Sequence, residues 1–397
     1  MKVLICGMDG YIGWPLALSL ISGEGWEVVG IDNFSRRQEV AEVGSDSAIP
    51  IASMEERLAA CEEALGSSPS FYNGDLRDYQ FIENVLRVEQ PDAIVHLGEM
   101  PSAPYSMMDA RRAYFTQENN VLGTLNLLFA LRDNGPNTHL VKLGTMGEYG
   151  TPNTDIPEGD FEVEYNGRRD WLPFPRQPGS IYHLSKVHDS ANILFTCKVW
   201  GLRSTDIMQG VVYGTRTDET GLDDRLRTRF DFDAVFGTAI NRYCAQAVSG
   251  HPLTPYGKGH QKRGFIALRD SLQCLSIALS NPPSEGEYRT FNQFDEVYDV
   301  TTLAEDVARI ATEMGIDVSV RHIRNPRMEL EEHYYNPDSK ALKKLGFTPL
   351  QTLSRELRGM IEDIHPYRDR IIALADAIEP RVRWNPNEVE AEPKVTH

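Results

Sequence analysis

The sequence has 397 residues, of which 41% are hydrophobic and 25% charged, and its formal net charge is −18. The chain is longer than a protein with one ordinary hydrophobic core, and its composition is that of a soluble globular protein. The negative charge argues against a nucleic acid or an anionic membrane as the partner, because both attract basic surfaces. An anionic substrate would therefore need a local cluster of arginines or backbone N–H groups.

The cysteines are scattered and show no C-x-x-C spacing: Cys6, Cys61, Cys197, Cys244 and Cys274. This pattern predicts neither a disulfide framework nor a metal site, and it fits a reducing compartment. No signal peptide or long apolar run precedes the first expected strand. We therefore expect a cytoplasmic protein without a bound metal.

A glycine-rich loop follows the first expected strand, Lys2 to Cys6, and leads into a helical pattern from Tyr11 to Ile21. Its glycines are spaced G-x-x-G-x-x-G. Such glycines let the backbone turn tightly and approach a pyrophosphate, whose charge then faces the free N–H groups of the helix N-terminus. The loop predicts a dinucleotide site that is contacted by Gly7, Gly10, Tyr11, Ile12 and Gly13.

The second expected strand, Trp26 to Ile31, ends at Asp32. An acidic side chain at this point, about twenty residues past the glycines, is placed to bind both ribose hydroxyls of NAD. Arg36 and Arg37 follow closely and could instead favour the 2′-phosphate of NADP. We favour NAD, because Asp32 would repel that phosphate.

Two further β-α repeats continue the expected cofactor wall. One strand is Phe71 to Leu76, whose last residues, Asp75 and Leu76, would reach the adenine, and the other is Asp92 to Leu97. A helix from Met54 to Leu65 is expected in the long connection before them. Further cofactor contacts are expected from Asn33, Leu97, Gly98 and Glu99.

Asn119 opens a helix that we expect to run through Leu131. Its side chain either bonds to the cofactor or ties backbone loops together, as buried asparagines commonly do. We include Asn119 among the candidate cofactor contacts.

A fifth expected strand, Leu140 to Gly144, delivers Thr145, and a helix follows from Tyr182 to Trp200. Tyr182 and Lys186 are four residues apart and thus share one face of that helix. A cation one turn away lowers the pKa of a phenol, so Tyr182 could take a proton near neutral pH while Thr145 bonds to the same hydroxyl. Beside a dinucleotide site, this trio predicts alcohol oxidation with hydride transfer to a nicotinamide.

Glu148 and His183 are candidates for further proton transfer. Glu148 lies in the loop after Thr145, where a carboxylate could act as an acid or base, or could cap the loop or form a local ion pair. His183 lies beside Tyr182 and has an ordinary pKa suited to proton transfer near neutrality, although it could also simply pack.

These motifs, in this order, resemble the nucleotide-sugar branch of the extended short-chain dehydrogenase/reductase superfamily. The stretches TMGEYG-T-P, SAPYSM, YHLSKVHD and EEHYYN are most similar to the UDP-sulfoquinovose synthase family. The resemblance implies a Rossmann-type doubly wound parallel sheet of the α/β class with a smaller mixed α/β C-terminal substrate lobe. We expect an NAD domain at 1–208, a UDP-sugar lobe interleaved with it at 209–384, and a polar tail at 385–397.

The resemblance also implies an activity, the conversion of UDP-glucose and sulfite to UDP-sulfoquinovose with NAD as a recycled cofactor. Carbon 4 would be oxidised transiently, water lost from carbons 5 and 6, sulfite added at carbon 6, and the ketone reduced again, with Glu148 and His183 serving the elimination. A UDP-sugar 4-epimerase or 4,6-dehydratase and a non-catalytic dinucleotide sensor remain alternatives. Dehydratases carry Asp and Glu directly after the Thr, where this chain has Met146 and Gly147.

The substrate contacts implied by the resemblance are Ser102, Thr145, Tyr182, His183, Gln209, Arg263, Arg327 and Glu329. Arg263 and Arg327 would grip the diphosphate, since a guanidinium binds it in a planar, bidentate way, unless they form structural ion pairs. Gln209 and Val212 would also touch the nicotinamide, as would Tyr182 and Lys186. The family tends to carry Arg where this chain has Pro101, and the superfamily commonly forms homodimers.

Two segments lie outside the motifs that carry the resemblance. The polar insertion 153–179 contains Asn166-Gly167, which predicts a hairpin turn, and its length suggests a cover over the substrate. The charged segment 215–236 is expected to be a solvated insertion, with a substrate or subunit contact as the alternative.

Overall fold

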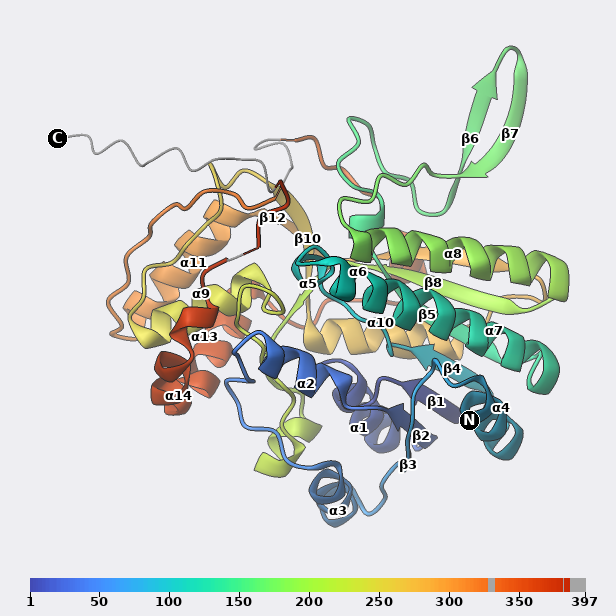
Figure 1. Cartoon of the computed structure of the whole chain (residues 1–397), viewed down its shortest axis with the longest axis horizontal. Helices are drawn as coiled ribbons and strands as arrows, with labels where there is room; N and C mark the ends of the chain where they lie inside the picture. Colours follow the sequence, from blue (N-terminus) through green and yellow to red (C-terminus); the bar gives the residue numbers. More distant parts are fainter. Residues whose placement is uncertain (328–332, 381, 386–397) are drawn as a thin grey trace.

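The computed structural model describes residues 1–327, 333–380 and 382–385 (Figure 1). Its centre is a seven-stranded sheet in the order β11-β8-β5-β4-β1-β2-β3, and all of its strand pairs are parallel. The strand order reverses between β1 and β4, as in doubly wound folds, so the expected Rossmann-type sheet is confirmed. The strands are β1 Lys2–Cys6, β2 Glu27–Asp32, β3 Ser70–Asn73, β4 Ala93–His96, β5 His139–Thr145, β8 Arg203–Gln209 and β11 Tyr288–Gln293.

The central strands are short apolar runs, because helices cover the sheet on both faces. In β1 the side chains from Val3 to Cys6 have no exposed surface. One apolar cluster joins the sheet to α1 Gly13–Glu24, α3 Met54–Leu65 and α10 Leu268–Ser280. A second, on the opposite face, joins it to α4 Tyr79–Glu89, α7 Gly123–Asn134 and α8 Ile181–Trp200.

Two of the expected helices have informative starts. α3 begins at Met54 as expected, because Ser53 and Glu56 form a capping box before it. The helix expected to open at Asn119 begins earlier: α6 Ala110–Gln117 runs through the π-helical turn η1 Glu118–Leu122 into α7. The π turn buries Asn120, whose Oδ1 accepts the Met100 backbone N–H at 2.7 Å. This ties the helix to the loop after β4.

The smaller lobe is built on a three-stranded sheet of β9 Val211–Tyr213, β10 Lys262–Ala267 and β12 Glu296–Asp299. Its apolar cluster packs this sheet against α9 Ala239–Ser249, α11 Val300–Glu313, α13 Leu353–Ile364 and α14 Arg368–Ala373. Between these elements the chain returns to the main sheet as α10 and β11. Short helices at α2 Ser35–Glu42, α5 Ala103–Ser106 and α12 Ala341–Lys344 complete the fold.

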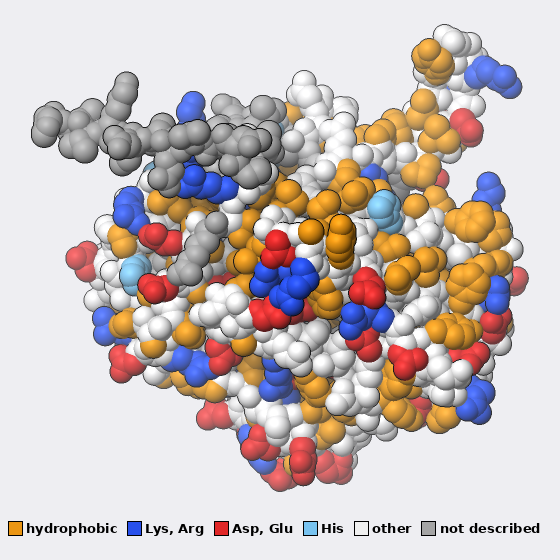
Figure 2. Space-filling view, in the orientation of Figure 1, with side chains coloured by type: hydrophobic (Ala, Val, Ile, Leu, Met, Phe, Trp, Pro, Cys, Tyr) orange, Lys and Arg blue, Asp and Glu red, His pale blue; other side chains and the backbone are white. Residues whose placement is uncertain are grey.

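The insertion after β5 forms the expected hairpin, β6 Asp160–Tyr165 and β7 Arg168–Pro173. Asn166 and Gly167 at its turn have φ angles of 50° and 76°, the left-handed conformation of tight hairpin turns. The hairpin stands away from the body of the protein (Figures 1 and 2). The hairpin itself therefore does not form the cover that the length of the insertion suggested, whereas Gln177 and Gly179, at the end of the insertion, line a cavity beside Tyr182.

The expectation that 215–236 is a solvated insertion is wrong. Phe230 and Phe232 are fully buried, and Arg229 and Asp231 are nearly so. We call residues 224–236 the strap, because this segment crosses the N-terminal half of the chain. The Thr228 hydroxyl donates to the Tyr11 carbonyl at 2.9 Å.

Further strap contacts reach α1, α3 and the loop after α2. The Trp14 indole donates to the Leu226 carbonyl at 2.9 Å, Arg57 donates to the Arg227 carbonyl at 2.8 Å, and the Ala48 N–H donates to the Phe230 carbonyl at 2.9 Å. The buried charges Arg229 and Asp231 pair with one another, and Asp231 also pairs with Arg36 of the N-terminal half. Among the described residues no helix is long and apolar enough to cross a membrane.

Candidate active site

Two cavities meet at the carboxyl ends of the main strands. The first, of about 340 Å³, runs over the glycine loop and the tip of β2. The second, of about 480 Å³, lies between that edge and the smaller lobe. Thr145, Tyr182 and Gln209 line both cavities. Ligands of doubly wound sheets bind at this edge, so the residues shared by the two cavities are where a cofactor and a substrate would meet.

Most of the expected cofactor residues line the first cavity: Gly7, Gly10, Tyr11, Ile12, Gly13, Asp32, Asn33, Arg36, Leu76, Leu97, Gly98, Glu99, Asn119, Tyr182, Lys186, Gln209 and Val212. Two do not. Arg37 makes a bidentate contact with Asp9, both bonds 2.7 Å long, and Asp75 accepts bonds from Asn33 and Arg77. The expected roles of Arg37 and Asp75 as direct contacts therefore receive no support from the geometry.

The glycine loop packs closely against the backbone around it. A Cβ on Gly13 would lie 2.2 Å from the Gly7 carbonyl oxygen, and one on Gly7 would lie 2.7 Å from the Leu97 backbone. The loop thus keeps an open cradle only with glycine at these positions, as a bound pyrophosphate requires.

Asp32 lies at the tip of β2, where its two oxygens accept the backbone N–H groups of Phe34 at 2.7 Å and Asp9 at 2.8 Å. Burial, and then the nearby Asp9, raise the pKa of Asp32 to about 6. At neutral pH the carboxylate is mostly ionised and can accept further bonds. Such an acceptor fits the ribose hydroxyls of NAD and opposes a 2′-phosphate.

The strap supplies cavity residues that the sequence interpretation missed. Arg229 and Asp231 line the first cavity beside Arg36 and Glu39. Asp231 accepts bonds from Arg36 at 2.8 Å and from Arg229 at 2.9 Å. Burial acts to raise the pKa of Asp231, but the two guanidiniums outweigh it and lower the pKa to about 2. The alternation of Phe230 and Phe232 with charges was the available signal, since a fully solvated run rarely carries aromatic residues.

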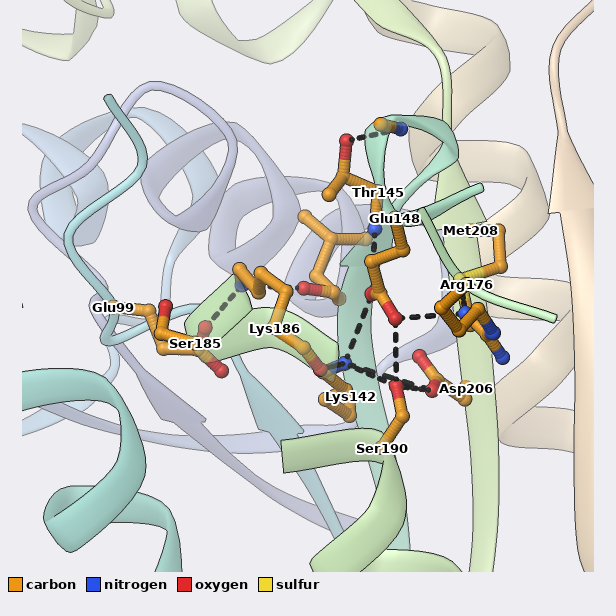
Figure 3. Close-up of polar contacts among 12 residues, drawn as sticks. Glu99, Lys142, Thr145, Glu148, Arg176, Ser185, Lys186, Ser190, Asp206 and Met208 are labelled. Carbon is orange, nitrogen blue, oxygen red and sulfur yellow. Dashed lines mark hydrogen bonds and ion pairs between the residues drawn. The ribbon is translucent and has the colours of Figure 1, made fainter. Parts of the chain in front are cut away.

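The expected trio is assembled from β5 and α8. Thr145 ends β5, Tyr182 lies in the first turn of α8, and the Lys186 ammonium lies 6.0 Å from the centre of the Tyr182 ring. The Lys186 ammonium donates to the Leu143 carbonyl at 2.7 Å and forms an ion pair with Glu99 (Figure 3).

The pKa of the Tyr182 phenol is raised, not lowered as the helical spacing suggested. Burial is the main cause, followed by the negative charges of Glu99 and Glu148, and the opposing effects of Lys142 and of the hydrogen bond with Thr145 are smaller. Lys186 does not act as a free cation, because Glu99 neutralises it.

Glu148 is fully buried and lines neither cavity among the described residues. Its Oε2 accepts bonds from Arg176 at 2.7 Å and from the Ser190 hydroxyl at 3.0 Å, and its Oε1 lies 3.3 Å from the Lys142 ammonium (Figure 3). This arrangement corresponds to the ion-pair alternative given for Glu148. It anchors the turn after Thr145 rather than reaching a substrate.

His183, by contrast, lines the second cavity. Its Nδ1 lies 2.9 Å from the hydroxyl of Ser180, the residue that caps α8. The ring packs against Gly147 so closely that a Cβ there would lie 2.3 Å from the His183 Nε2. The absence of a side chain at Gly147 therefore decides where the imidazole lies.

The second cavity gathers the expected substrate residues Ser102, Thr145, Tyr182, His183, Gln209, Arg263 and Arg327. Glu329 lies outside the described residues. Arg242 on α9 was missed: it is buried, its NH1 has no hydrogen-bond partner, and its guanidinium lies 4.4 Å from the centre of the Tyr256 ring. The described wall contains His183 and three arginines but no aspartate or glutamate.

Comparison with known proteins places this site in a family. The model of the NAD dependent epimerase/dehydratase family matches residues 3–292. The UDP-sulfoquinovose synthase of Sulfolobus acidocaldarius is 49% identical over 97% of this chain and 98% of its own length. The chloroplastic UDP-sulfoquinovose synthase of Spinacia oleracea is 48% identical over 96% of this chain and 79% of its own length.

Solved structures share the fold at lower identity. The UDP-glucose 4-epimerase of Bifidobacterium longum, in complex with NAD+ and UDP, has a TM-score of 0.70 at 16% identity and covers 94% of this chain and 100% of its own. The chain therefore belongs to the NAD dependent epimerase/dehydratase family and, within it, to the group of the UDP-sulfoquinovose synthases.

Proposed function

We propose that this protein forms UDP-sulfoquinovose from UDP-glucose and sulfite. The observation that carries the proposal is the nearly full-length identity of 49% and 48% to two UDP-sulfoquinovose synthases, over the segments that hold Thr145, Tyr182 and His183. A UDP-glucose 4-epimerase and a dTDP-glucose 4,6-dehydratase are also similar, but at 30% identity or less. The alternatives therefore have less support.

NAD is the cofactor of this family, and the first cavity fits it. Gly7, Gly10 and Gly13 would hold the pyrophosphate, Asp32 the adenosine ribose, and Lys186 the ribose of the nicotinamide. When bound there, NAD supplies a reversible hydride acceptor. The strap would close over the cofactor from the other side, which suits a cofactor that is recycled within one catalytic cycle.

The second cavity has the charge that a nucleotide diphosphate requires. The protein as a whole is strongly acidic, with a net charge of −18, yet the charged side chains on the described wall are all arginines. Arg263 and Arg327 would bind the diphosphate, and Arg242 provides a third guanidinium whose NH1 has no partner. This local reversal of charge favours UDP-glucose and sulfite, both of which are anions.

The oxidation would begin at Tyr182. Its phenolate takes the proton of the sugar 4-hydroxyl, which Thr145 orients by a hydrogen bond, as the hydride leaves carbon 4. The resulting 4-ketone acidifies the hydrogen on carbon 5. The same two side chains return the proton when the ketone is reduced at the end of the cycle.

His183 would carry the middle steps. It takes the carbon 5 proton and returns it to the departing 6-hydroxyl, so that water is released and carbon 6 can accept sulfite. Addition of sulfite returns one proton to carbon 5. The overall change is UDP-glucose plus sulfite and a proton to UDP-sulfoquinovose plus water. We assign Glu148 the structural role of holding the turn between Thr145 and Gly147.

Pro101 lines both cavities at the position where the family tends to carry Arg. The negative charge of sulfite would therefore be balanced in this chain by other groups. The cations on the described wall of the second cavity are Arg242, Arg263 and Arg327.

We further propose a homodimer and a cytoplasmic location. Large apolar side chains are exposed on the face of α6 to α8, and Figure 2 shows hydrophobic side chains gathered over this region: Tyr114, Leu122, Phe129, Phe195 and Val199. Two copies of this face would form a helical interface. The location rests on the five cysteines, all of which are buried free thiols.

The test of the proposed activity is one reaction followed by mass spectrometry. The purified protein is incubated with UDP-glucose, with and without sulfite, and we expect a sulfonated UDP-hexose only when sulfite is present. Formation of UDP-galactose alone would establish the epimerase alternative. A dehydrated UDP-sugar that forms equally well without sulfite as the final product would establish the dehydratase.

The dimer is tested separately by light scattering after size-exclusion chromatography. We expect twice the chain mass for the parent protein and a monomer for Phe195→Glu, which places a charge on the exposed face of α8. A parent protein that elutes with the mass of one chain would refute the dimer.

A further inference from the structure

Glu99 is a buried carboxyl in the wall of the cofactor cavity. It follows β4, close to the carboxyl ends of β1 and β5, and its side chain is 1% exposed. Burying an ionised carboxyl costs several kcal/mol unless the charge is paired. Glu99 therefore needs a specific partner at this position.

That partner is Lys186. The Lys186 ammonium forms an ion pair with the Glu99 Oε2 (Figure 3). The His96 Nε2 lies 3.3 Å from the Glu99 Oε1. Burial lowers the pKa of His96 to about 4, so its imidazole is neutral at the pH of the cytoplasm and does not offset the carboxylate. In the described part of the chain, Glu99 is the carboxylate within ion-pair distance of Lys186.

The neighbouring charges are already paired with one another. The Lys142 ammonium lies between the carboxylates of Glu148 and Asp206, at 3.3 Å and 3.5 Å, and Glu148 also binds Arg176. Lys142 is bonded to the backbone of α8 rather than to Glu99, since it donates to the Lys186 carbonyl at 3.1 Å. The compensation of the positive charge of Lys186 therefore depends on Glu99.

Asp189 is the remaining titratable group that faces this pair from α8. It lies three residues after Lys186, it is fully buried, and neither of its oxygens has a hydrogen-bond partner in the described structure. Burial, and then the charge of Glu99, raise its pKa far above the usual range. Asp189 is thus protonated, and it could ionise in place of a lost Glu99.

We propose that Glu99 is a positioning residue that holds the Lys186 ammonium and cancels its charge, so that Tyr182 holds its proton strongly and its phenolate is a strong base for the sugar hydroxyl. The inference rests on the proposed function, because the proton that Tyr182 takes there is that of the sugar 4-hydroxyl. Without Glu99, the cation beside Tyr182 would favour the phenolate, which would form at a lower pH and would be a weaker base.

In the opening step Tyr182 takes the 4-hydroxyl proton, and in the closing step it returns that proton to the same oxygen, while bound NAD would accept and return the hydride. A Tyr182 that holds its proton weakly is a poorer acceptor in the opening step, although more of it is phenolate at neutral pH. Glu99 therefore shifts the pH range in which Tyr182 works upward.

The test follows the initial rate at which bound NAD is reduced, by absorbance, after UDP-glucose is mixed with the holoenzyme, without sulfite, between about pH 5.5 and pH 10. For Glu99→Gln we expect the pH midpoint of this rate to fall by about one to two units, the size of shift that one charge at 4–6 Å produces. At neutral pH the initial rate should rise, because more of Tyr182 is then phenolate. A merely structural role for Glu99 would lower the rate at every pH and leave the midpoint in place.

Three variants control the result. Glu99→Asp keeps the charge and should keep the parent midpoint. Glu42→Gln removes an equal charge from an exposed ion pair with Arg111 and should leave the midpoint unchanged. Glu99→Gln combined with Asp189→Asn removes the group that could ionise instead, and should move the midpoint at least as far as Glu99→Gln alone.

The possible outcomes separate the role of Glu99 from the proposed function. A parent midpoint retained in both Glu99→Gln and the double variant, with normal NAD reduction, would overturn the role of Glu99 and leave the proposed function intact. A shift seen only in the double variant would support the inference and identify Asp189 as the substitute anion. A parent holoenzyme whose NAD is not reduced by UDP-glucose at any pH would refute the proposed function and this inference together.

Discussion

Replacement of Gly147 by alanine is expected to separate the hydride step from the later chemistry. The added Cβ would lie 2.3 Å from the Nε2 of His183 and 2.5 Å from its Cδ2. Ordinary contacts begin at 3.4 Å, so the imidazole must move by about 1 Å. A displacement of that size at a reacting group costs about a hundredfold in rate.

The three atoms nearest to the added Cβ all belong to His183, so the methyl group acts first on that ring. Gly147→Ala should therefore still reduce bound NAD with UDP-glucose. Formation of the sulfonated sugar, followed by mass spectrometry, should fall by about a hundredfold. The variant thus tests whether His183 carries the elimination.

Gly23→Ala is the matched control, since its Cβ would meet no atom within 4 Å on α1. We expect it to retain both activities and to be slightly more stable, because alanine is a better helix former than glycine by about 1 kcal/mol. If Gly147→Ala made the sulfonated sugar at the parent rate, the role assigned to His183 would be refuted.

Three further predictions concern the trio and the cofactor. Tyr182→Phe should abolish reduction of bound NAD by UDP-glucose while the cofactor content measured after denaturation stays unchanged; normal reduction would remove Tyr182 from its role. Asp231→Asn breaks both guanidinium contacts of the strap and should release bound NAD at least tenfold faster in a chase with labelled NAD, whereas an unchanged release rate would mean that the strap does not retain the cofactor. Affinity for NAD should fall below about pH 6, by at most tenfold per pH unit, because the pKa of Asp32 is raised to about 6 and its carboxylate is protonated below that pH. Asp32→Asn should bind NAD weakly at every pH. A pH-independent affinity in the parent protein would contradict the assignment of Asp32.

Local patterns were sufficient to predict the sheet, the glycine loop, and the placement of Tyr182 and Lys186 on one helical face. Each of these depends on residues that are close in sequence, and the chemistry of glycine or of helical spacing sets their geometry directly. The hairpin at Asn166-Gly167 was predictable for the same reason.

What failed depends on partners distant in sequence. The charge of Lys186 is cancelled by Glu99, and Arg37 is occupied by Asp9 rather than directed toward the cofactor. Glu148 is close to Thr145 in the chain, yet its side chain turns toward Lys142 and Arg176, away from the cavity. No rule based on sequence spacing predicts with which of several nearby cations a carboxylate will form an ion pair.

The charged run of the strap was misinterpreted for a related reason. Charged segments are usually exposed because burying an unpaired charge is costly. In the strap the cost is avoided, since Arg229 and Arg36 share Asp231 within the same buried cluster. A sequence shows the charges but not the pairing that permits their burial.

The strap also sets the time at which the protein can first close its cofactor cavity during synthesis. The bond from Thr228 to Tyr11 joins residues 217 positions apart, and that from Leu226 to Trp14 spans 212. At about 5–20 residues per second on the ribosome, the glycine loop is synthesised roughly 10–40 seconds before the strap that packs against it. The nascent chain therefore passes through a stage in which the dinucleotide half has emerged but its cavity is still open, and NAD can enter before the strap is made.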